Sequence, residues 1–444
     1  MEFDWQYFLV LKSEKESCQG CLICRICFTE LQMEYHKDSW LSRSHKRKLE
    51  EVEPNVRCFS IDELNQDLLE RVLSWLPASS LFRLTSVCKR WKSVTQSLSF
   101  QLACSKIPFR EPWFYMVGSN SNQLTVFDSS ERSWKKLNPP PSLQPNVSQD
   151  SIPVAASGAL MCFFNEPSDF TVCNHVTGAS RKLPKVLPPQ RSQALHALAM
   201  TTLPSQQGYK IVLIYKDLAR WSCRIFNSVT NIWEEETAFT RNRESKSWVF
   251  EESEIDCPMY FLSKTGNVVA TDVHRSPSKQ YSSVITKSNG DEIVYFLTSS
   301  GTIVSCNLTR KWFLEYPRLL PFFSEYSVDL VECGGEMLVV VLSEFFESAS
   351  LRVWKFDDCA GSWHQVCAMP PTYSHEFYGR KVDINCVGAG NQILVCLSSG
   401  HFFSYVTCNL ETHKWEELPS VTADGCAVEF ISAFAFEPRI EASV

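Results

Sequence analysis

Apolar residues recur at helical spacing in the stretch 59–102, whereas much of the chain after it alternates apolar and polar positions. Six apolar residues follow one another at steps of four, one, three, one and three, and we expect them to share one face of an amphipathic helix: Leu64, Leu68, Leu69, Val72, Leu73 and Leu76. Pro77 is predicted to end this helix, and Ser79 or Ser80 to cap a second one.

The second helix is short and holds Leu81, Leu84 and Val87, and a third run places Trp91, Val94 and Phe100 at roughly helical spacing. Three helices in about forty residues are too few to bury this much apolar surface on their own. The excess predicts a partner surface or a second domain that covers it. An ordinary helical hairpin within a larger core is the alternative interpretation.

The apolar positions of this stretch resemble the pattern of an F-box, with one departure. The matching positions are Leu64, the pair Leu68 and Leu69, Val72-Leu73, Leu76-Pro77, Leu81 and Val87-Cys88-Lys89-Arg90-Trp91. Asn65 stands where that family usually has a proline, so the entry to the first helix is expected to be looser. The resemblance covers the whole stretch and implies a small three-helix F-box over residues 59–104.

A repeating unit follows in residues 105–444. Each copy has two short strands and an Asn or Asp at the end of the second strand. A tryptophan follows five or six positions later, except in one copy that has Arg181 in its place. The Asn or Asp residues are Asp128, Asn174, Asn227, Asn307, Asp357 and Asn409, and the tryptophans are Trp134, Trp233, Trp312, Trp363 and Trp415. An Asx side chain bonds its own backbone in a turn, and we expect the tryptophan to pack between neighbouring sheets.

One interval in the repeat is too long. Asn227 and Asn307 are 80 positions apart, and the segment 259–272 between them aligns without gaps on 294–307. It makes a seventh hairpin, but it lacks the tryptophan, so it is either a reduced blade or an insertion. All-β repeats of this length predict a β-propeller, with seven blades of about 48 residues favoured over six of about 56.

The repeats resemble kelch repeats, whose glycine pair is present at Gly334-Gly335. The last apolar run, Ala427 to Phe436, has no hairpin after it, and we expect it to pair near Phe114–Val117 and close the ring. The predicted fold class is therefore α+β multidomain, an F-box followed by an all-β kelch-type propeller. A β-sandwich with chance similarity between its strands is the alternative.

Composition limits the cellular compartments and the classes of ligand that are expected for this protein. The chain carries a net charge of −7, which argues against nucleic acid as a ligand because phosphate binding needs a basic surface. No apolar run approaches the ~18 residues that cross a membrane, and the first residues do not form a signal peptide. The 19 scattered cysteines then indicate a reducing nucleus or cytoplasm. Five of them are expected to act as small buried side chains in strands: Cys162, Cys173, Cys306, Cys396 and Cys408.

The segment 1–58 lacks periodicity and is predicted to be largely disordered. Its four evenly spaced cysteines could bind a metal through thiolates, but an unstructured cysteine-rich tail is the default interpretation: Cys18, Cys21, Cys24 and Cys27. A basic run is consistent with a nuclear import signal, although solvated charge is the simpler interpretation: Arg43, Lys46, Arg47 and Lys48.

The sequence contains no recognisable catalytic motif, and we predict no catalytic residue, metal site or cofactor. Together the two regions resemble the F-box/kelch-repeat proteins that are abundant in plants. That resemblance implies a substrate-recognition subunit of an SCF-type cullin–RING ubiquitin ligase. Its F-box would bind the SKP-type adaptor through Leu64, Leu68, Leu69, Leu73, Pro77, Leu81 and Val87, with Trp91 holding the third helix.

The propeller would bind an unknown target protein, and the irregular loops 140–152, 236–256 and 272–290 are the candidates for that contact. Two alternatives stay open. The propeller could be an enzyme or a small-ligand sensor whose abundance the F-box regulates, or the chain could be an adaptor-bound scaffold that works without a ligase.

Overall fold

The computed structural model divides the chain into two units, Met1–Leu69 and Glu70–Val444. The structure describes residues 64–86, 88–118, 124–138, 151–165, 169–186, 194–203, 208–217, 220–242, 260–262, 268–270, 283–298, 301–317, 319, 326–345, 347–400, 402–423 and 426–444. The predicted segment 1–58, with its cysteine run and its basic run, lies outside these residues. Of the first unit, only residues 64–69 are described, and they contain the start of a helix.

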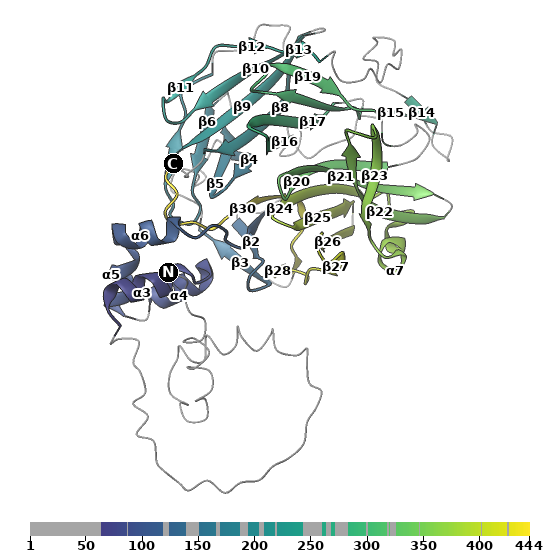
Figure 1. Cartoon of the computed structure of the whole chain (residues 1–444). Helices are drawn as coiled ribbons and strands as arrows, with labels where there is room; N and C mark the ends of the chain where they lie inside the picture. Colours follow the sequence, from purple (N-terminus) through teal and green to yellow (C-terminus); the bar gives the residue numbers. More distant parts are fainter. Residues whose placement is uncertain are drawn as a thin grey trace, which may run out of the picture. The chain divides into compact units, whose positions relative to one another are not determined.

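The described residues of the F-box region form four helices rather than the expected three (Figure 1): α3 (Gln66–Ser74), α4 (Ala78–Thr85), α5 (Lys89–Thr95) and α6 (Leu98–Ser105). The third predicted helix is split because Ser97 interrupts it. The hydroxyl of Ser97 accepts a hydrogen bond from the backbone N–H of Phe100 and so caps a new helix.

The prediction that Ser79 or Ser80 caps the second helix was wrong. Pro77 occupies the N-cap position and makes no side-chain cap, because its ring carries no hydrogen-bonding atom. Ser80 instead accepts a hydrogen bond from the guanidinium of Arg83, at 3.1 Å. Ser79 lies within α4, but its hydroxyl donates to the carboxylate of Asp128 in the propeller.

The strands of the second unit form six blades of a β-propeller (Figure 1). Blade 1 contains β1 (Trp113–Gly118), β2 (Leu124–Asp128), β3 (Ser133–Leu137) and β30 (Phe430–Phe436). Blade 2 contains β4 (Ser151–Ser157), β5 (Leu160–Asn165), β6 (Asp169–Cys173) and β7 (Ser180–Lys182). Blade 3 contains β8 (Ala194–Thr202), β9 (Tyr209–Asp217), β10 (Arg220–Asn227), β11 (Ile232–Trp233) and β12 (Thr237–Ala238).

The remaining blades have the same meander order. Blade 4 contains β16 (Ser283–Ser288), β17 (Asp291–Leu297), β18 (Ile303–Asn307), β19 (Trp312–Glu315) and, at its edge, β13 (Thr240–Arg241). Blade 5 contains β20 (Tyr326–Cys333), β21 (Glu336–Phe345), β22 (Ser348–Asp357) and β23 (Ser362–Ala368). Blade 6 contains β24 (Asp383–Ala389), β25 (Gln392–Ser399), β26 (Phe402–Asn409) and β27 (Lys414–Glu417), and follows helix α7 (Pro371–Ser374) and the 3-10 turn η5 (His375–Phe377).

Six blades, counted over the described residues, correct the preference for seven. The extra hairpin becomes an isolated two-stranded sheet, β14 (Tyr260–Leu262) with β15 (Val268–Ala270), inside the connection from blade 3 to blade 4. A second small hairpin, β28 (Thr422–Ala423) with β29 (Cys426–Ala427), precedes β30. Among its described residues the segment 259–272 forms only two strands of three residues each, so strand-like alternation alone did not make it a blade.

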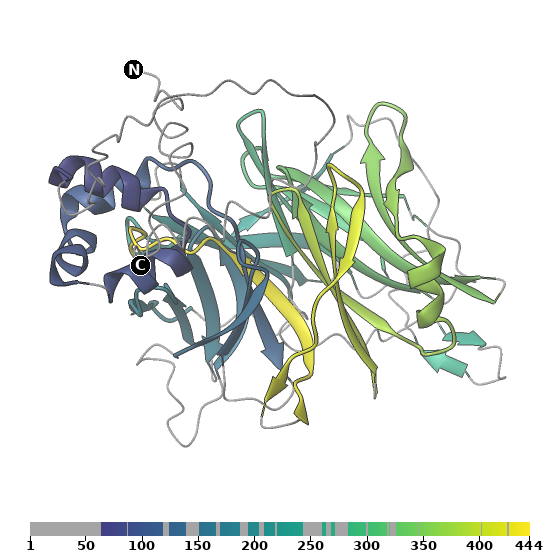
Figure 2. The same ribbon diagram turned by 90° about the horizontal axis from the view of Figure 1, so that it is seen from below.

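The ring closes as predicted, by pairing of the last strand with the first blade. Strand β30 runs antiparallel to β1, with Phe114 opposite Ala435 and Met116 opposite Ala433. Figure 2 shows this yellow strand running beside the blue strands of blade 1. Because β30 is the innermost strand of blade 1, the two ends of the repeat region share one sheet.

The Asx turns also form as predicted. In all six blades the Asx side chain accepts hydrogen bonds from backbone N–H groups two or three residues later, and the residue four positions later has a positive φ. Glycine fills that last position only at Gly178 and Gly361. The other four blades place a bulkier residue there, which costs free energy in the left-handed region.

Three of the tryptophans join neighbouring blades through one recurring contact. Each indole N–H donates to the carbonyl of a proline at the end of the preceding blade, at 2.8–2.9 Å: Trp134 to Pro419, Trp233 to Pro184 and Trp363 to Pro317. Trp415 is buried in the core between blades 5 and 6, and Trp312 is partly buried at the start of β19. The tryptophans thus stabilise the interfaces between sheets as well as their own hairpins.

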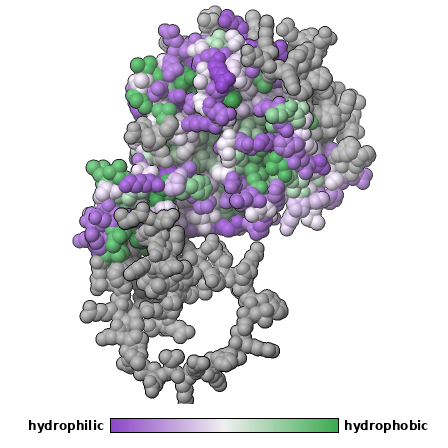
Figure 3. Space-filling view, in the orientation of Figure 1, coloured by the Kyte–Doolittle hydropathy of each residue, from purple (hydrophilic) through white to green (hydrophobic). Residues whose placement is uncertain are grey.

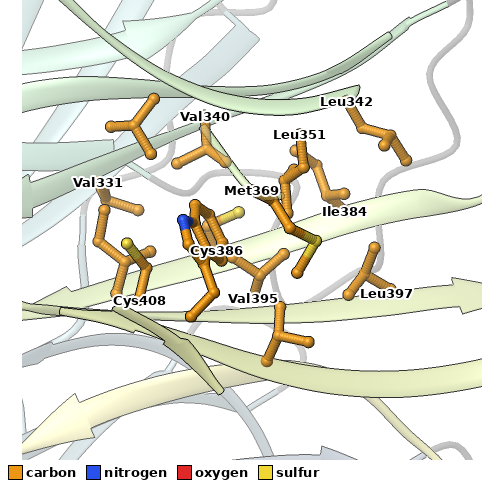
Figure 4. Packing of buried hydrophobic residues seen from close by; sticks show 14 of the residues in the cluster. Val331, Val340, Leu342, Leu351, Met369, Ile384, Cys386, Val395, Leu397 and Cys408 are labelled. Atoms are coloured by element: carbon orange, nitrogen blue, oxygen red, sulfur yellow. The ribbon is translucent and has the colours of Figure 1, made fainter. Parts of the chain in front are cut away.

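The core consists of apolar layers between adjacent blades. Figure 4 shows the layer between blades 5 and 6, where aliphatic side chains from both sheets interdigitate around the thiols of Cys386 and Cys408. Near the axis the blades come closer still. A Cβ at Gly388 of β24 would lie 2.0 Å from the carbonyl oxygen of Glu332 on β20, so only glycine fits there. Gly334-Gly335 form the next turn along, both with positive φ.

Candidate functional site

The helices of the second unit expose large apolar side chains, which we call the helix surface. Trp75, just after α3, is 68% exposed, and Leu98 and Leu102 on α6 are 77% and 64% exposed. Leu98 and Leu102 lie one turn apart on the same face of α6. Val72 and Phe82 complete the helix surface, and green side chains mark the helical region at the left of Figure 3. Large apolar side chains exposed on several helices of one small region favour a protein–protein contact.

The opposite sides of the same helices form a small core. Buried side chains from α3 to α6 fill it, each less than one twentieth exposed: Leu73, Leu81, Leu84, Trp91, Val94 and Phe100. Such residues set the positions of the helices but present no surface to a partner. Within the apolar side of α3, Leu69 and Leu73 are buried, whereas Leu68 and Val72 lie at its exposed edge. Leu64 and Leu76, which were expected on the same helix, lie just outside it.

The eight residues assigned to adaptor binding divide accordingly. Leu69, Leu73, Leu81 and Trp91 are buried, Leu68 is exposed, and Leu64 and Pro77 are partly buried. Val87 lies outside the described residues. Their docking role stays a prediction, while the structure points to the neighbouring Val72, Trp75, Leu98 and Leu102 as the accessible side chains. These accessible residues could have been found from the sequence, because the stretch has more apolar positions than the buried sides of its helices can hold.

Helix α4 is joined to blade 1 through buried polar contacts. Ser79 donates its hydroxyl to Oδ2 of Asp128, the Asx residue of the first turn, and Lys135 lies 2.8 Å from the same oxygen. Ala78 packs into the apolar cluster that contains Trp113. Asp128 is fully buried, so one side chain both closes a propeller turn and holds a helix.

The protonation state of Asp128 follows from these contacts. Burial by itself raises the pKa of the carboxyl, but hydrogen bonds from Lys135, Ser130 and Ser79 outweigh it and hold the pKa below its ordinary value. Asp128 is therefore ionised at neutral pH and can accept all of these donors. The joint between helix and blade depends on that charge.

Strand directions divide the turns of the propeller between two faces. In each blade the third strand ends, and the fourth strand begins, at an Asx turn. Because neighbouring strands are antiparallel, the Asx turns lie on the same face of the propeller as the turns that follow the innermost strands. Ser79 contacts this Asx-turn face at Asp128. The connections from one blade to the next, including α7, leave from the other face.

Several titratable side chains are buried in the propeller, and burial shifts their pKa values. Burial lowers the pKa of His175 to about 4, and its ring stacks on Tyr115 with centroids 5.1 Å apart. Burial also raises the pKa of Cys173, to about 12, and of Cys333, to about 12. In the part of the chain that the structure describes, no three His, Cys, Asp or Glu side chains are grouped to hold a metal ion. Nor does any helix among those residues have the length and apolar character needed to cross a membrane.

Comparison with known proteins identifies both regions. Residues 61–102 match the F-box domain family, and residues 126–374 match the KIB1-4 beta-propeller family. The chain belongs to the F-box proteins with a KIB1-4 β-propeller. It is similar to F-box only protein 13 of Arabidopsis thaliana, with 48% identity over 91% of each chain. F-box only protein 6 of the same plant is 25% identical over 84% of this chain and 73% of its own length.

Kelch-repeat relatives match over shorter spans. An F-box/kelch-repeat protein of Arabidopsis thaliana is 32% identical over 31% of this chain and 33% of its own length. The combination of F-box and propeller is, in general, that of an SCF substrate adaptor, and F-box domains in general bind SKP-type adaptors. The plant F-box/propeller assignment made from the sequence is confirmed.

Proposed function

We propose that this chain is a substrate-recognition subunit of an SCF-type cullin–RING ubiquitin ligase. Its helix surface binds the SKP-type adaptor, and its propeller holds a target protein for ubiquitination. The observation that supports this most is the exposure of Trp75, Leu98 and Leu102 on helices that belong to an F-box. Large aromatic and aliphatic side chains that lose contact with water on binding are the usual hot spots of an interface.

The contribution of the chain is positioning rather than covalent chemistry. A target held beside the ubiquitin-charged conjugating enzyme reacts at the effective concentration of a tethered pair instead of by random encounter. Such a subunit needs two binding surfaces and a fixed distance between them. It acts in the nucleus, the cytoplasm or both, where free thiols such as those of Cys104, Cys306 and Cys396 stay reduced.

The propeller face opposite the Asx turns is the one we assign to the target. The Asx-turn face of blade 1 is already covered in part by α4, through Ser79 and Asp128. The predicted loops 140–152, 236–256 and 272–290 belong largely to the connections between blades, whose flanking strands β3, β4 and β16 end or begin on the opposite face. Most of their residues lie outside the described part of the chain.

Reconstitution tests this function directly. The purified full chain is mixed with a SKP-type adaptor, and complex formation is followed by size-exclusion chromatography with light scattering. We expect a 1:1 complex that also recruits a cullin–RING module. A folded chain that stays monomeric in the presence of excess adaptor would contradict the proposal. Target identity then follows from affinity capture with ligase activity blocked, so that the bound target accumulates instead of being degraded.

A further inference from the structure

The linker between the F-box helices and the propeller is held from two sides by buried arginines. Residues 106–112 connect α6 to β1. Within this linker, Arg110 is 8% exposed and donates to the carbonyl oxygens of Ser74 and Leu76, at 2.9 and 3.0 Å. These carbonyls belong to the C-terminal end of α3 and to the turn after it. Arg110 therefore ties the linker back to the helices.

The second arginine comes from the far end of the repeat region. Arg439 follows β30, is 2% exposed, and donates from Nη1 to the carbonyl of Ile107 at 3.0 Å and from Nη2 to that of Pro108 at 3.2 Å. Its charge is balanced by two carboxylates, Glu437 at 2.6 Å and Glu441 at 3.1 Å. A guanidinium with its fork of donors can satisfy all four acceptors at once, which a lysine cannot.

The segment that carries Arg439 is itself fixed to blade 2. The side-chain amide of Asn174 donates to the carbonyls of Arg439 and Ala442, at 2.9 and 3.0 Å. The backbone N–H of Glu437 donates to the carbonyl of Gly158, at 2.7 Å. Asn174 is one of the six Asx residues, so this turn, like that of Asp128, serves a contact outside its own blade.

We propose that Arg439 is a positioning residue that locks the F-box helices to the propeller. The segment 437–444 acts as a strap: it is bonded to blade 2 at one side and to the linker at the other. Together with Arg110 and the bond from Ser79 to Asp128, it fixes the direction in which the helix surface points from the propeller. The role of this strap in ubiquitin transfer rests on the proposed function. A subunit that tethers a target near the conjugating enzyme works only if the distance between its two binding surfaces is defined.

Cys104 provides a native reporter for the lock. It lies on α6, two residues before the linker, and is fully buried beside Arg110, Arg439 and Glu441. Cys306 of blade 4 is also fully buried, but it lies in the core between blades 3 and 4. Loosening of the joint exposes Cys104 alone, whereas unfolding of the propeller exposes both thiols.

The test is alkylation of the full-length native protein by N-ethylmaleimide, with the rate at each cysteine read by peptide mass spectrometry. In Arg439→Met we expect Cys104 to react at least tenfold faster while the rate at Cys306 is unchanged. Arg439→Lys should give an intermediate rate at Cys104, since it keeps the charge but loses the fork. Arg241→Met is the matched control, because Arg241 also pairs with a glutamate, at 3.5 Å, but is exposed on blade 4.

Two results would overturn the lock. One is an unchanged rate at Cys104 in Arg439→Met, and the other is an equal rise at Cys104 and Cys306, which would make Arg439 a general stability residue. If Arg439→Met does not fold, Arg110→Met gives the same comparison from the other side of the linker. Adaptor binding is measured on the same samples. If the wild-type protein fails to bind the adaptor, the proposed function is wrong, but the inference about Arg439 is unaffected.

Discussion

The short helical region between Glu70 and Ser105 exposes five large apolar side chains, on its helices and just after α3: Val72, Trp75, Phe82, Leu98 and Leu102. The much longer propeller, over the residues that the structure describes, buries most of its large apolar side chains fully or partly in layers between blades and exposes Val229, Ile232 and Tyr373. A region that can bury its apolar surface within itself does so, and a region that cannot leaves that surface for a partner. The comparison separates the residues that fold this protein from those that connect it to others.

Removal of residues 424–444 should destabilise the propeller more than any single substitution. The deletion removes β30, the innermost strand of blade 1, together with Arg439. We expect complete loss of the cooperative unfolding transition, because the ring then has an open edge and blade 1 loses its partner strand. Circular dichroism during heating measures this, and a truncated protein with an unchanged melting temperature would refute ring closure by β30.

Gly388→Ala should be the most damaging single substitution inside the propeller. The added Cβ would meet the carbonyl oxygen of Glu332 at 2.0 Å, so β24 and β20 would have to move apart. We expect a loss of about 3 kcal/mol in the free energy of unfolding, measured in urea.

Gly379→Ala is the control for that experiment. Nothing lies within 4 Å of its added Cβ, but its φ of 74° is unfavourable for alanine. It should cost only the backbone strain, about 1–2 kcal/mol. Equal losses at the two glycines would show that the inner strands are not closely packed.

Alanine at the exposed apolar positions should separate folding from binding. We expect Trp75→Ala and Leu98→Ala each to weaken adaptor binding by about 2 kcal/mol, or roughly thirtyfold, while the melting temperature stays within about 2 °C of wild type. Ile232→Ala is the matched control, since Ile232 is also 62% exposed but lies on a propeller turn. Titration calorimetry measures all three, and a loss of affinity with Ile232→Ala equal to that of the helix variants would remove the distinction between the regions.

Asp128→Asn should weaken the joint between the two regions in a pH-dependent way. Since the pKa of Asp128 is held low in the folded protein, its carboxylate contributes stability above the unfolded pKa of about 4, and that contribution is lost as the pH falls through the folded pKa. We expect a loss of about 1–2 kcal/mol in the variant at pH 7. The difference between variant and wild type should shrink between pH 5 and pH 3.

Asp357→Asn provides the comparison for the joint. Asp357 closes the equivalent turn of blade 5 through backbone N–H groups, at 2.8 and 3.0 Å, and is joined to no helix. Its replacement should destabilise the protein less than Asp128→Asn does. Equal losses in urea unfolding would mean that the contact with Ser79 adds nothing to the turn.

The smallest change in stability is expected from substitutions at the positive-φ position of the Asx turns. His413 has a φ of 53° at the end of the blade 6 turn, where blade 2 has Gly178. We expect His413→Gly to raise the free energy of unfolding by about 0.5 kcal/mol and Gly178→Ala to lower it by about 1 kcal/mol. Opposite signs in chemical denaturation would support the common turn geometry, and two losses would contradict it.

The propeller was largely predictable because its signals are local and repeated. The Asx residue, the aromatic residue that follows it and the alternating strands recur at similar spacing, and the unpaired last run pointed to the pairing of β30 with β1. The blade number was not predictable, since the segment of β14 and β15 has the alternating pattern of a blade but forms a separate two-stranded sheet.

The helical region and its joint were less predictable because they depend on distant contacts. Periodicity placed α3 but could not say which of two adjacent leucines faces inward. Ser79 has the residue type of a helix cap, yet a carboxylate 49 positions away determines its role. Arg439 contacts Ile107 across 332 positions, and no local pattern marks either residue.

Hydrogen exchange of the full chain with and without a SKP-type adaptor tests the central claim most directly. Binding at the helix surface predicts slower exchange of backbone amides in α3 and α6, with no change in the turn that holds Val229 and Ile232. Protection centred on the propeller, or a bound adaptor that leaves exchange in both helices unchanged, would contradict the assignment of the exposed apolar side chains to the adaptor.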